Sequence, residues 1–377
     1  MADDDALLEI LALNLVNGVG PRMLTLLLER FETAGRVLRA SGAELLDVPG
    51  VGPKLSAEIT RALQSDRAVN ELKRCQAAGI KLLIRGSDQF PPMLEETCDP
   101  PNVLYCQGEY REGDQLAIGV VGSRSCTMYG RQQAERLSGA LARAGITIIS
   151  GLARGIDAAA HRGALAAGGR TIAVCATGLE NIYPPEHQRL SEEICEAGAL
   201  LTESPLDRAP SAGLFPQRNR IISGLSLGVL VIEANRKSGA MHTVRHAMEQ
   251  GREVFAVPGR IDCPASQGCH DLIRDGVPLV RDVDDILEAL GPLLNPVRRN
   301  ESVGAPLTET VLTPRELTLN DQERLVLNIV TLEPILIDEV LRQLELEPSR
   351  VLSTLTILEM KRFVRRLPGG LVSRISH

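Results

Sequence analysis

A regular alternation of apolar strands, glycine-rich loops and helices between residues 117 and 281 constrains the fold most strongly. The apolar segments predict seven strands, at Ala117–Val121, Thr147–Ser150, Thr171–Cys175, Ala199–Glu203, Leu227–Ile232, Glu253–Val257 and Pro278–Arg281. The segments between them predict five helices, at Tyr129–Ala144, Asp157–Ala167, Gln188–Ala197, Asn219–Gly224 and Met241–Gln250. Continuous Val, Ile and Leu runs that alternate with helices are typical of a parallel sheet covered on both faces. We therefore predict an α/β domain at residues 73–290 with a Rossmann-like, doubly wound, mostly parallel sheet.

The segment before this domain contains two similar turns, Leu15–Pro21 and Leu46–Pro53, each followed by an amphipathic stretch. A Gly-hydrophobic-Gly turn between two helices leaves the N–H groups at the start of the second helix unpaired, and such groups can hold a phosphate. This internal repeat predicts a helical domain at residues 1–72, which resembles the helix-hairpin-helix motif of DNA repair proteins. Two interpretations stay open, because ordinary αα-hairpins that only dock on a neighbouring domain would show the same pattern.

The C-terminal part of the chain indicates a tethered small domain. Residues 291–317 hold four prolines with polar spacing and are predicted to be a linker. Residues 318–377 predict three short helices and a β-hairpin, at Asp321–Thr331, Leu336–Leu344, Ser349–Arg362 and Phe363–Ile375. This order of elements is typical of a winged helix, which could contact DNA or serve as a protein-interaction module.

Composition excludes several classes of protein. The net charge of −7 is unlike that of many nucleic-acid-binding proteins, yet residues 122–162 and 215–245 are locally basic. Apolar runs are too short to span a bilayer, and the acidic N-terminus lacks the basic start of a secretory signal. We expect a cytoplasmic protein with no membrane segment. Eight cysteines form no Cys-x-x-Cys pair, so we expect reduced core thiols and no metal site.

Cationic side chains gather in the loops that follow four of the predicted strands. Ser123 and Arg124 follow the first strand, and the second leads into Arg154 with Asp157 as a candidate N-cap. The other two loops bring Phe215, Arg218, Asn219 and Arg220, and then Lys237. In a parallel sheet these loops open on one edge, where ligands bind. Any single arginine could instead form a structural ion pair with Asp157 or Glu233, but four cationic loops in register predict an anion-binding site.

The sequence lacks the motifs of the common nucleotide-dependent enzymes. No Gly-x-x-x-x-Gly-Lys-Ser/Thr loop occurs, and the first strand-to-helix turn lacks Gly-x-Gly-x-x-Gly. His242 and His246 are four residues apart, but Thr243 stands where a zinc protease has Glu. We therefore expect no catalytic constellation, no cofactor and no metal.

Six segments together resemble the DNA processing protein A family (DprA, also called Smf). They are Gly122–Arg124, Ser150–Asp157, Ile182–Glu186, Phe215–Ile222, Lys237–Ala240 and Glu253–Gly259. The resemblance covers about residues 80–290. Both flanking segments also resemble the family, whose members often carry an N-terminal helical domain of the sterile-alpha-motif or helix-hairpin-helix type and a C-terminal winged helix. The resemblance implies a protein that is not an enzyme, binds and protects incoming single-stranded DNA, forms a homodimer, and helps load its partner RecA during natural transformation.

By position in these motifs, the resemblance implies DNA-binding roles for thirteen residues: Gly122, Ser123, Arg124, Gly151, Arg154, Gly155, Phe215, Arg218, Asn219, Arg220, Lys237, Ser238 and Gly239. Two positions depart from the family pattern, because His270 and Leu214 stand where many relatives carry Asn. Phe215 is the candidate for stacking on a base, although it could equally anchor its loop in the core.

A rival interpretation is a nucleotide-processing enzyme. The predicted sheet also resembles the phosphoribohydrolases of the lysine-decarboxylase-like group, but their Pro-Gly-Gly-x-Gly-Thr segment is absent and only the fragment Val257–Arg260 remains. A structural adaptor that works through the winged helix would leave the four cationic loops unexplained. Single-stranded DNA binding is therefore the interpretation that accounts for most of the pattern.

Overall fold

The computed structural model describes residues 2–291 and parts of the chain beyond them. Those parts are residues 326–327, 329–330, 335–343, 350–351, 354–355, 358, 363–367 and 371–374. The chain forms two compact units that divide between residues 300 and 301. Each unit is described by itself.

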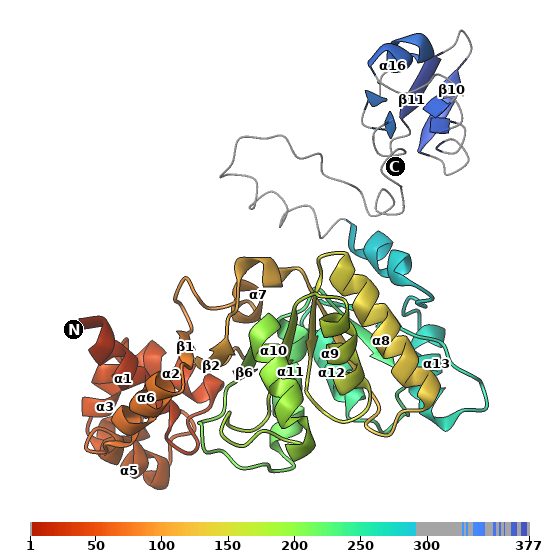
Figure 1. The fold of residues 1–377 in the computed structure, drawn as a ribbon. Coiled ribbons are helices and arrows are strands. Elements are labelled where there is room, and N and C mark those ends of the chain that lie inside the picture. The colour runs from red at the N-terminus through yellow and green to blue at the C-terminus, as the bar shows by residue number, and fades with distance from the viewer. Residues whose placement is uncertain are drawn as a thin grey trace. The chain divides into compact units, whose positions relative to one another are not determined.

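The first unit is built around one mixed sheet of eight strands (Figure 1). Its order is β1-β2-β6-β5-β4-β3-β7-β8. The strands are β1 Lys81–Ile84, β2 Val103–Gly108, β3 Ala117–Gly122, β4 Thr147–Ser150, β5 Thr171–Val174, β6 Ala199–Thr202, β7 Gly228–Ile232 and β8 Glu253–Ala256. Strands β3 to β8 pair in parallel, with Ile118 of β3 opposite both Ile148 and Gly228. The predicted doubly wound, mostly parallel sheet is confirmed.

The strands at one edge of this sheet were not predicted, and the strand predicted beyond the other edge is not formed. Strands β1 and β2 were not predicted, because they lie outside the strand–helix alternation. They pair antiparallel with each other, and β2 pairs antiparallel with β6. At the opposite edge, the predicted strand Pro278–Arg281 is wrong and forms only an isolated bridge between Leu279 and Ala256. Its proline has no N–H to donate to a sheet ladder.

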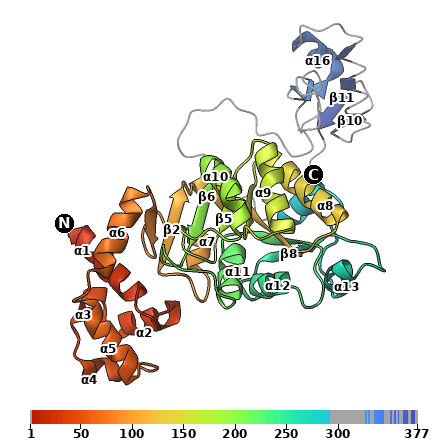
Figure 2. The ribbon, with the colours of Figure 1, turned by 60° about the horizontal axis from the view of Figure 1, so that its bottom comes forward.

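Helices cover both faces of the sheet (Figure 2). One face carries α7 Pro92–Glu95, α11 Leu214–Gly224, α12 Ala240–Glu249 and α13 Gln267–Arg274. The other carries α8 Met128–Arg143, α9 Ile156–Ala166, α10 Gln188–Ala197 and the helix at 283–291. Successive strand residues point to opposite faces, so Val121 packs on the first face and Val120 on the second.

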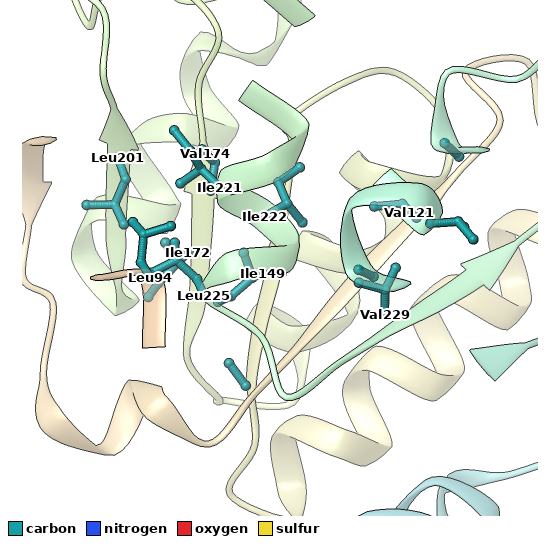
Figure 3. Close-up of a cluster of buried hydrophobic side chains, with 14 of the residues drawn as sticks. Leu94, Val121, Ile149, Ile172, Val174, Leu201, Ile221, Ile222, Leu225 and Val229 are labelled. Atoms are coloured by element: carbon teal, nitrogen blue, oxygen red, sulfur yellow. The ribbon is translucent and has the colours of Figure 1, made fainter. Parts of the chain in front are cut away.

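Helix α11 packs on the first face of the sheet and contributes residues to the candidate site. Figure 3 labels Ile221 and Ile222 of α11, and Leu225, the residue that follows the helix. They belong to the same buried cluster as the strand residues Ile172 and Val174. All five side chains are buried, and burying a side chain of this size contributes about 1.5–3 kcal/mol.

The predicted start of this helix at Asn219 is wrong, because α11 begins five residues earlier, at Leu214. A proline often marks a loop, but Pro216 lies in the first turn of α11. A helix does not need the N–H that proline lacks at that position. Arg218 and Arg220 therefore belong to a helix rather than to a strand-end loop.

The N-terminal helices gather at the end of the sheet where β1 and β2 lie (Figure 1). They are α1 Ala2–Asn14, α2 Pro21–Phe31, α3 Ala34–Arg39, α4 Gly42–Leu46, α5 Pro53–Ala62 and α6 Arg67–Ala77. Leu11 of α1 and Cys75 of α6 share a buried cluster with Tyr105 of β2. The buried Glu71 accepts a hydrogen bond from the backbone N–H of Leu206 at 2.7 Å. The helices are thus packed firmly onto the sheet.

The second unit has the elements of a winged helix. The hairpin of β10 Val364–Leu367 and β11 Leu371–Arg374 pairs with β9 Ile335–Leu336, and α16 spans Ile337–Gln343. Residues 350–351, 354–355 and 358 are helical, within the range predicted for the third helix. The winged-helix prediction is confirmed.

The predicted division into domains stays a prediction. The boundary after residue 72 falls inside α6, which continues to Ala77. The predicted linker lies outside the described residues except for Gly291, and so does most of the predicted helix Asp321–Thr331.

Two further sequence expectations concern cysteines and membrane spans. All eight cysteines are free thiols, and Cys98 is exposed, so the expectation of core thiols is wrong for that residue. Within the described ranges, no helix combines the length and apolar character needed to cross a bilayer.

Candidate nucleic-acid interface

An open groove of about 810 Å³ lies where β3, β4 and β7 end at the carboxyl edge of the sheet. Gly122–Ser125 enter it from β3, Ala153 and Asp157 from the loop and helix after β4, and Asn235 from the loop after β7. The N-terminal turns of α11 and α12 form its other walls. Crevices beyond the carboxyl ends of parallel strands are where open α/β sheets bind ligands. We call this site the Arg124 groove.

Arg124 and Phe215 form a cation and aromatic pair at the groove. The guanidinium carbon of Arg124 lies 4.9 Å from the centroid of the Phe215 ring. The ring of Tyr183 meets Phe215 edge-on, with centroids 5.6 Å apart and an interplanar angle of 61°. Arg124 is exposed and forms no ion pair with the described part of the chain. The pair thus offers a free cation for a phosphate beside an aromatic surface for a base.

Arg218 and Asp157 form the floor of the groove. The buried Arg218 donates hydrogen bonds to the carbonyl oxygens of Gly151 (2.6 Å) and Val174. Burial lowers the pKa of Arg218, and burial raises the pKa of Asp157, which Arg218 opposes. Asp157 is not the predicted N-cap, because that position is Gly155; its carboxylate instead accepts the N–H groups of Gly151 and Ala153. Two buried groups of opposite charge thus lie under the groove, and hydrogen bonds to backbone groups hold both side chains.

Eight of the thirteen sequence-predicted residues line the groove together. They are Gly122, Ser123, Arg124, Phe215, Arg218, Asn219, Ser238 and Gly239. Lys237 is exposed on the loop that carries Ser238, outside the lining. Arg154 is also exposed, and its ion pair with Glu186 lowers the pKa of that carboxyl to about 2.

Arg220 opens on the same edge of the sheet but not into the Arg124 groove, so the expectation of one shared anion-binding site is wrong for it. Its guanidinium is buried, 3.1 Å from Asp99 and 2.5 Å from Glu203. The reason is helical geometry, because residues two apart on a helix do not face the same way. Arg218 lines the Arg124 groove and also a hollow on the other side of α11. Arg220 lines only that second hollow.

Two glycines shape the groove without contacting its interior. A Cβ on Gly151 would lie 2.5 Å from the Arg218 guanidinium. Gly155 has φ of +79°, and a Cβ there would lie 2.2 Å from the carbonyl oxygen of Ser123. Glycine is needed at 155 because two strand-end loops approach closely there, and at 151 because the Arg218 side chain packs against the backbone.

Replacing Gly155 by alanine is expected to lower the free energy of unfolding by about 3 kcal/mol, because both the backbone angle and the contact with Ser123 become strained. Gly168→Ala is the matched control: its φ is +70° but no atom lies within 4 Å, so a loss of only about 1 kcal/mol is expected. Urea unfolding of both variants measures the difference. Equal losses would show that the loop contact contributes nothing.

Sequence reasoning assigned neither the structural role of Glu233 behind the Arg124 loop nor a place in the groove to His242. Glu233 has φ of +50°, and its carboxylate accepts the Thr127 N–H at 2.7 Å. Its carbonyl oxygen accepts the Ser123 N–H at 2.6 Å, so it holds the Arg124 loop from both sides. His242, unlike Glu233, lines the groove, although its spacing with His246 only indicated a helix face. The positive φ of Glu233 gives no sequence signal, because Gly or Asn is the usual choice there.

Family models match three parts of the chain. Residues 81–291 match the DNA recombination-mediator protein A family, residues 311–370 the DprA winged helix domain, and residues 10–65 a SAM-like helix-hairpin-helix tandem. The first match covers more than half of the chain. The chain belongs to the DprA family.

Relatives of known name agree with this assignment. The protein Smf of Synechocystis sp. is 40% identical over 291 residues, which are 76% of this chain and 73% of that protein. The structure of DprA from Streptococcus pneumoniae matches with a TM-score of 0.66 and 35% identity, covering 73% of this chain and 95% of that one.

A second solved DprA structure, from Helicobacter pylori, is described as giving insight into a unique single-stranded DNA binding mode. It matches with a TM-score of 0.51 and 30% identity, over 56% of this chain and 96% of that one. The chain is thus a DNA-processing member of the DprA family with a single-stranded-DNA-binding structural relative.

The two departures from the DprA pattern lie away from the Arg124 groove. His270 is in α13, where its Nε2 lies 3.0 Å from the carbonyl oxygen of Gly259. Leu214 begins α11 and faces the side that Arg220 occupies. Neither residue lines the Arg124 groove.

Proposed function

We propose that this DprA-family chain binds single-stranded DNA in the Arg124 groove, without catalysing a reaction. In this proposal it acts in the cytoplasm as a homodimer, protects the incoming strand, and helps RecA assemble on it during natural transformation. Of the thirteen residues predicted from the sequence, the eight that line the groove contact the strand in this proposal, and Gly151 and Gly155 shape the loops. Arg154 and Lys237 are exposed outside the lining, and Arg220 points away from it.

The observation that carries the proposal is the exposed Arg124 guanidinium beside the Phe215 ring in an open groove. Sequence-tolerant binding of single strands combines cations for phosphates with aromatic faces for bases. A duplex conceals its base faces by stacking, so it cannot use the aromatic surface.

Two supports come from the family rather than from the groove. The Helicobacter pylori relative, described by its single-stranded DNA binding mode, favours the same ligand here. The roles of RecA and of a homodimer rest on the resemblance to the DprA family. The absence of catalysis is also part of the proposal and also rests on the resemblance to the DprA family.

The experiment that tests this function follows RecA assembly on a single strand with the full chain present. The wild-type protein is expected to speed assembly and to protect the strand from a nuclease, whereas Arg124→Ala should do neither well. Stimulation that is equal in the two proteins would contradict the proposal, as would release of a base from a nucleoside monophosphate.

A further inference from the structure

A second, larger groove of about 1450 Å³ continues along the same edge of the sheet. It lies after β5 and β6, at Cys175 and Glu203, and is closed on its far side by the N-terminal helices. We call it the Arg220 groove. The sheet order β6-β5-β4-β3-β7 places it directly beside the Arg124 groove.

The two grooves share their dividing wall. Arg218 lines both of them. The loop before α11 crosses from one to the other, since Asp207–Ala209 line the Arg220 groove and Pro210–Ala212 line the Arg124 groove. A chain-like ligand that fills the first groove can therefore pass over this loop into the second.

The charge of the Arg220 groove suits a polyanion. Five arginines line it against three carboxylates. Two of the carboxylates, Asp99 and Glu203, are already paired with Arg220. Arg22 and Arg208 are exposed and form no ion pair among the described residues, so they remain available for phosphates.

Two buried donors in the lining have no partner. Nη1 of Arg220 and Nδ2 of Asn102 find no hydrogen-bond acceptor in the described part of the chain, and both side chains are more than nine-tenths buried. Buried donors are nearly always satisfied in folded proteins. Two such groups in the lining of one groove indicate that acceptor atoms of a ligand belong there.

The far end of the groove offers a further anion site. Helix α2 begins at Pro21 after the turn Gly18–Gly20, and no side chain caps its N-terminus. The turn, Pro21, Arg22 and Met23 all line the Arg220 groove. Free N–H groups and the positive end of a helix stabilise a phosphate. This is the first of the two turns that the sequence repeat singled out.

We propose that a single DNA strand runs from the Arg124 groove across the 207–212 loop into the Arg220 groove, and reaches the N-terminus of α2 with a phosphate. This inference rests on the proposed function and extends it, because it gives the N-terminal helices a direct part in DNA binding. The continuity of the two grooves favours the same strand over a separate protein partner.

The test compares short and long oligothymidylates, about 4 and about 16 nucleotides, which bracket known single-strand site sizes. The wild-type chain should bind the long strand more tightly. The double variant Arg22→Ala/Arg208→Ala should bind the long strand about tenfold more weakly and the short strand unchanged, because two exposed phosphate contacts are lost. Asp207→Asn should instead strengthen binding of the long strand, since it removes a negative charge from the groove.

Arg143→Ala is the matched control, because Arg143 is exposed at the C-terminal end of α8, outside the lining of both grooves. It should change neither affinity. The inference is overturned if the double variant binds both lengths like the wild type, or loses affinity for both equally. Failure of the wild type to bind the short strand at all would instead contradict the proposed function.

Discussion

Replacing Phe215 by alanine is expected to weaken the binding of single-stranded DNA by about ten- to a hundredfold. The ring stands beside Arg124 at the open groove, and stacking on an aromatic side chain contributes about 1–3 kcal/mol per base. The truncation also removes the surface against which the guanidinium rests. Fluorescence anisotropy with a labelled oligothymidylate at fixed salt measures the loss.

Phe215→Tyr is the control, because it keeps the ring and should bind within about twofold of the wild type. Urea unfolding of the alanine variant separates binding from folding, since the ring also meets Tyr183 edge-on. An alanine variant that is less stable but binds with unchanged affinity would show that Phe215 only anchors its loop.

Replacing Arg220 by alanine is expected to lower the free energy of unfolding by about 3 kcal/mol. Its side chain is 8% exposed and pairs with Glu203, which is 24% exposed. Burial raises the pKa of Glu203, and Arg220 is the charge that opposes this shift. Removing one partner of a buried pair leaves the other uncompensated, which costs about 3–5 kcal/mol. We expect the lower end of this range of destabilisation because Glu203 retains some contact with water. Urea unfolding measures the loss.

Arg189→Ala provides the contrast for this measurement. Arg189 is 89% exposed and pairs with Glu193 one turn further along α10, where such pairs contribute about 0.3–0.5 kcal/mol. Equal destabilisation by the two substitutions would mean that the Arg220 pair is not structural, and that the residue is free to serve the DNA alone.

The parallel sheet could be predicted from sequence because each inner strand is a continuous apolar run between glycine-rich loops. Ile118 to Val121, for example, supply buried side chains to both faces. The Arg124 loop could be placed for the same reason, since the carboxyl ends of parallel strands meet at one edge. Strands β1 and β2 could not be predicted, because they pair antiparallel and lie outside the alternation of strands and helices.

The direction in which individual side chains point could not be predicted from the sequence. Arg218 and Arg220 have the same residue type and neighbouring positions, but the helical start at Leu214 sends them to different surroundings. The Arg220 groove depends on how the N-terminal helices pack on the sheet. That packing uses contacts such as Glu71 with Leu206, which are 135 residues apart and leave no local pattern.

The affinity of the full chain for a single strand and for the duplex of the same sequence, measured against salt with and without Arg124→Ala, tests the central claim most directly. The wild type should prefer the single strand, and the slope of log affinity against log salt should become shallower by about 0.7 in the variant, as expected for one lost phosphate contact on a single strand. Equal affinity for both DNA forms, or an unchanged slope in Arg124→Ala, would contradict binding in the Arg124 groove.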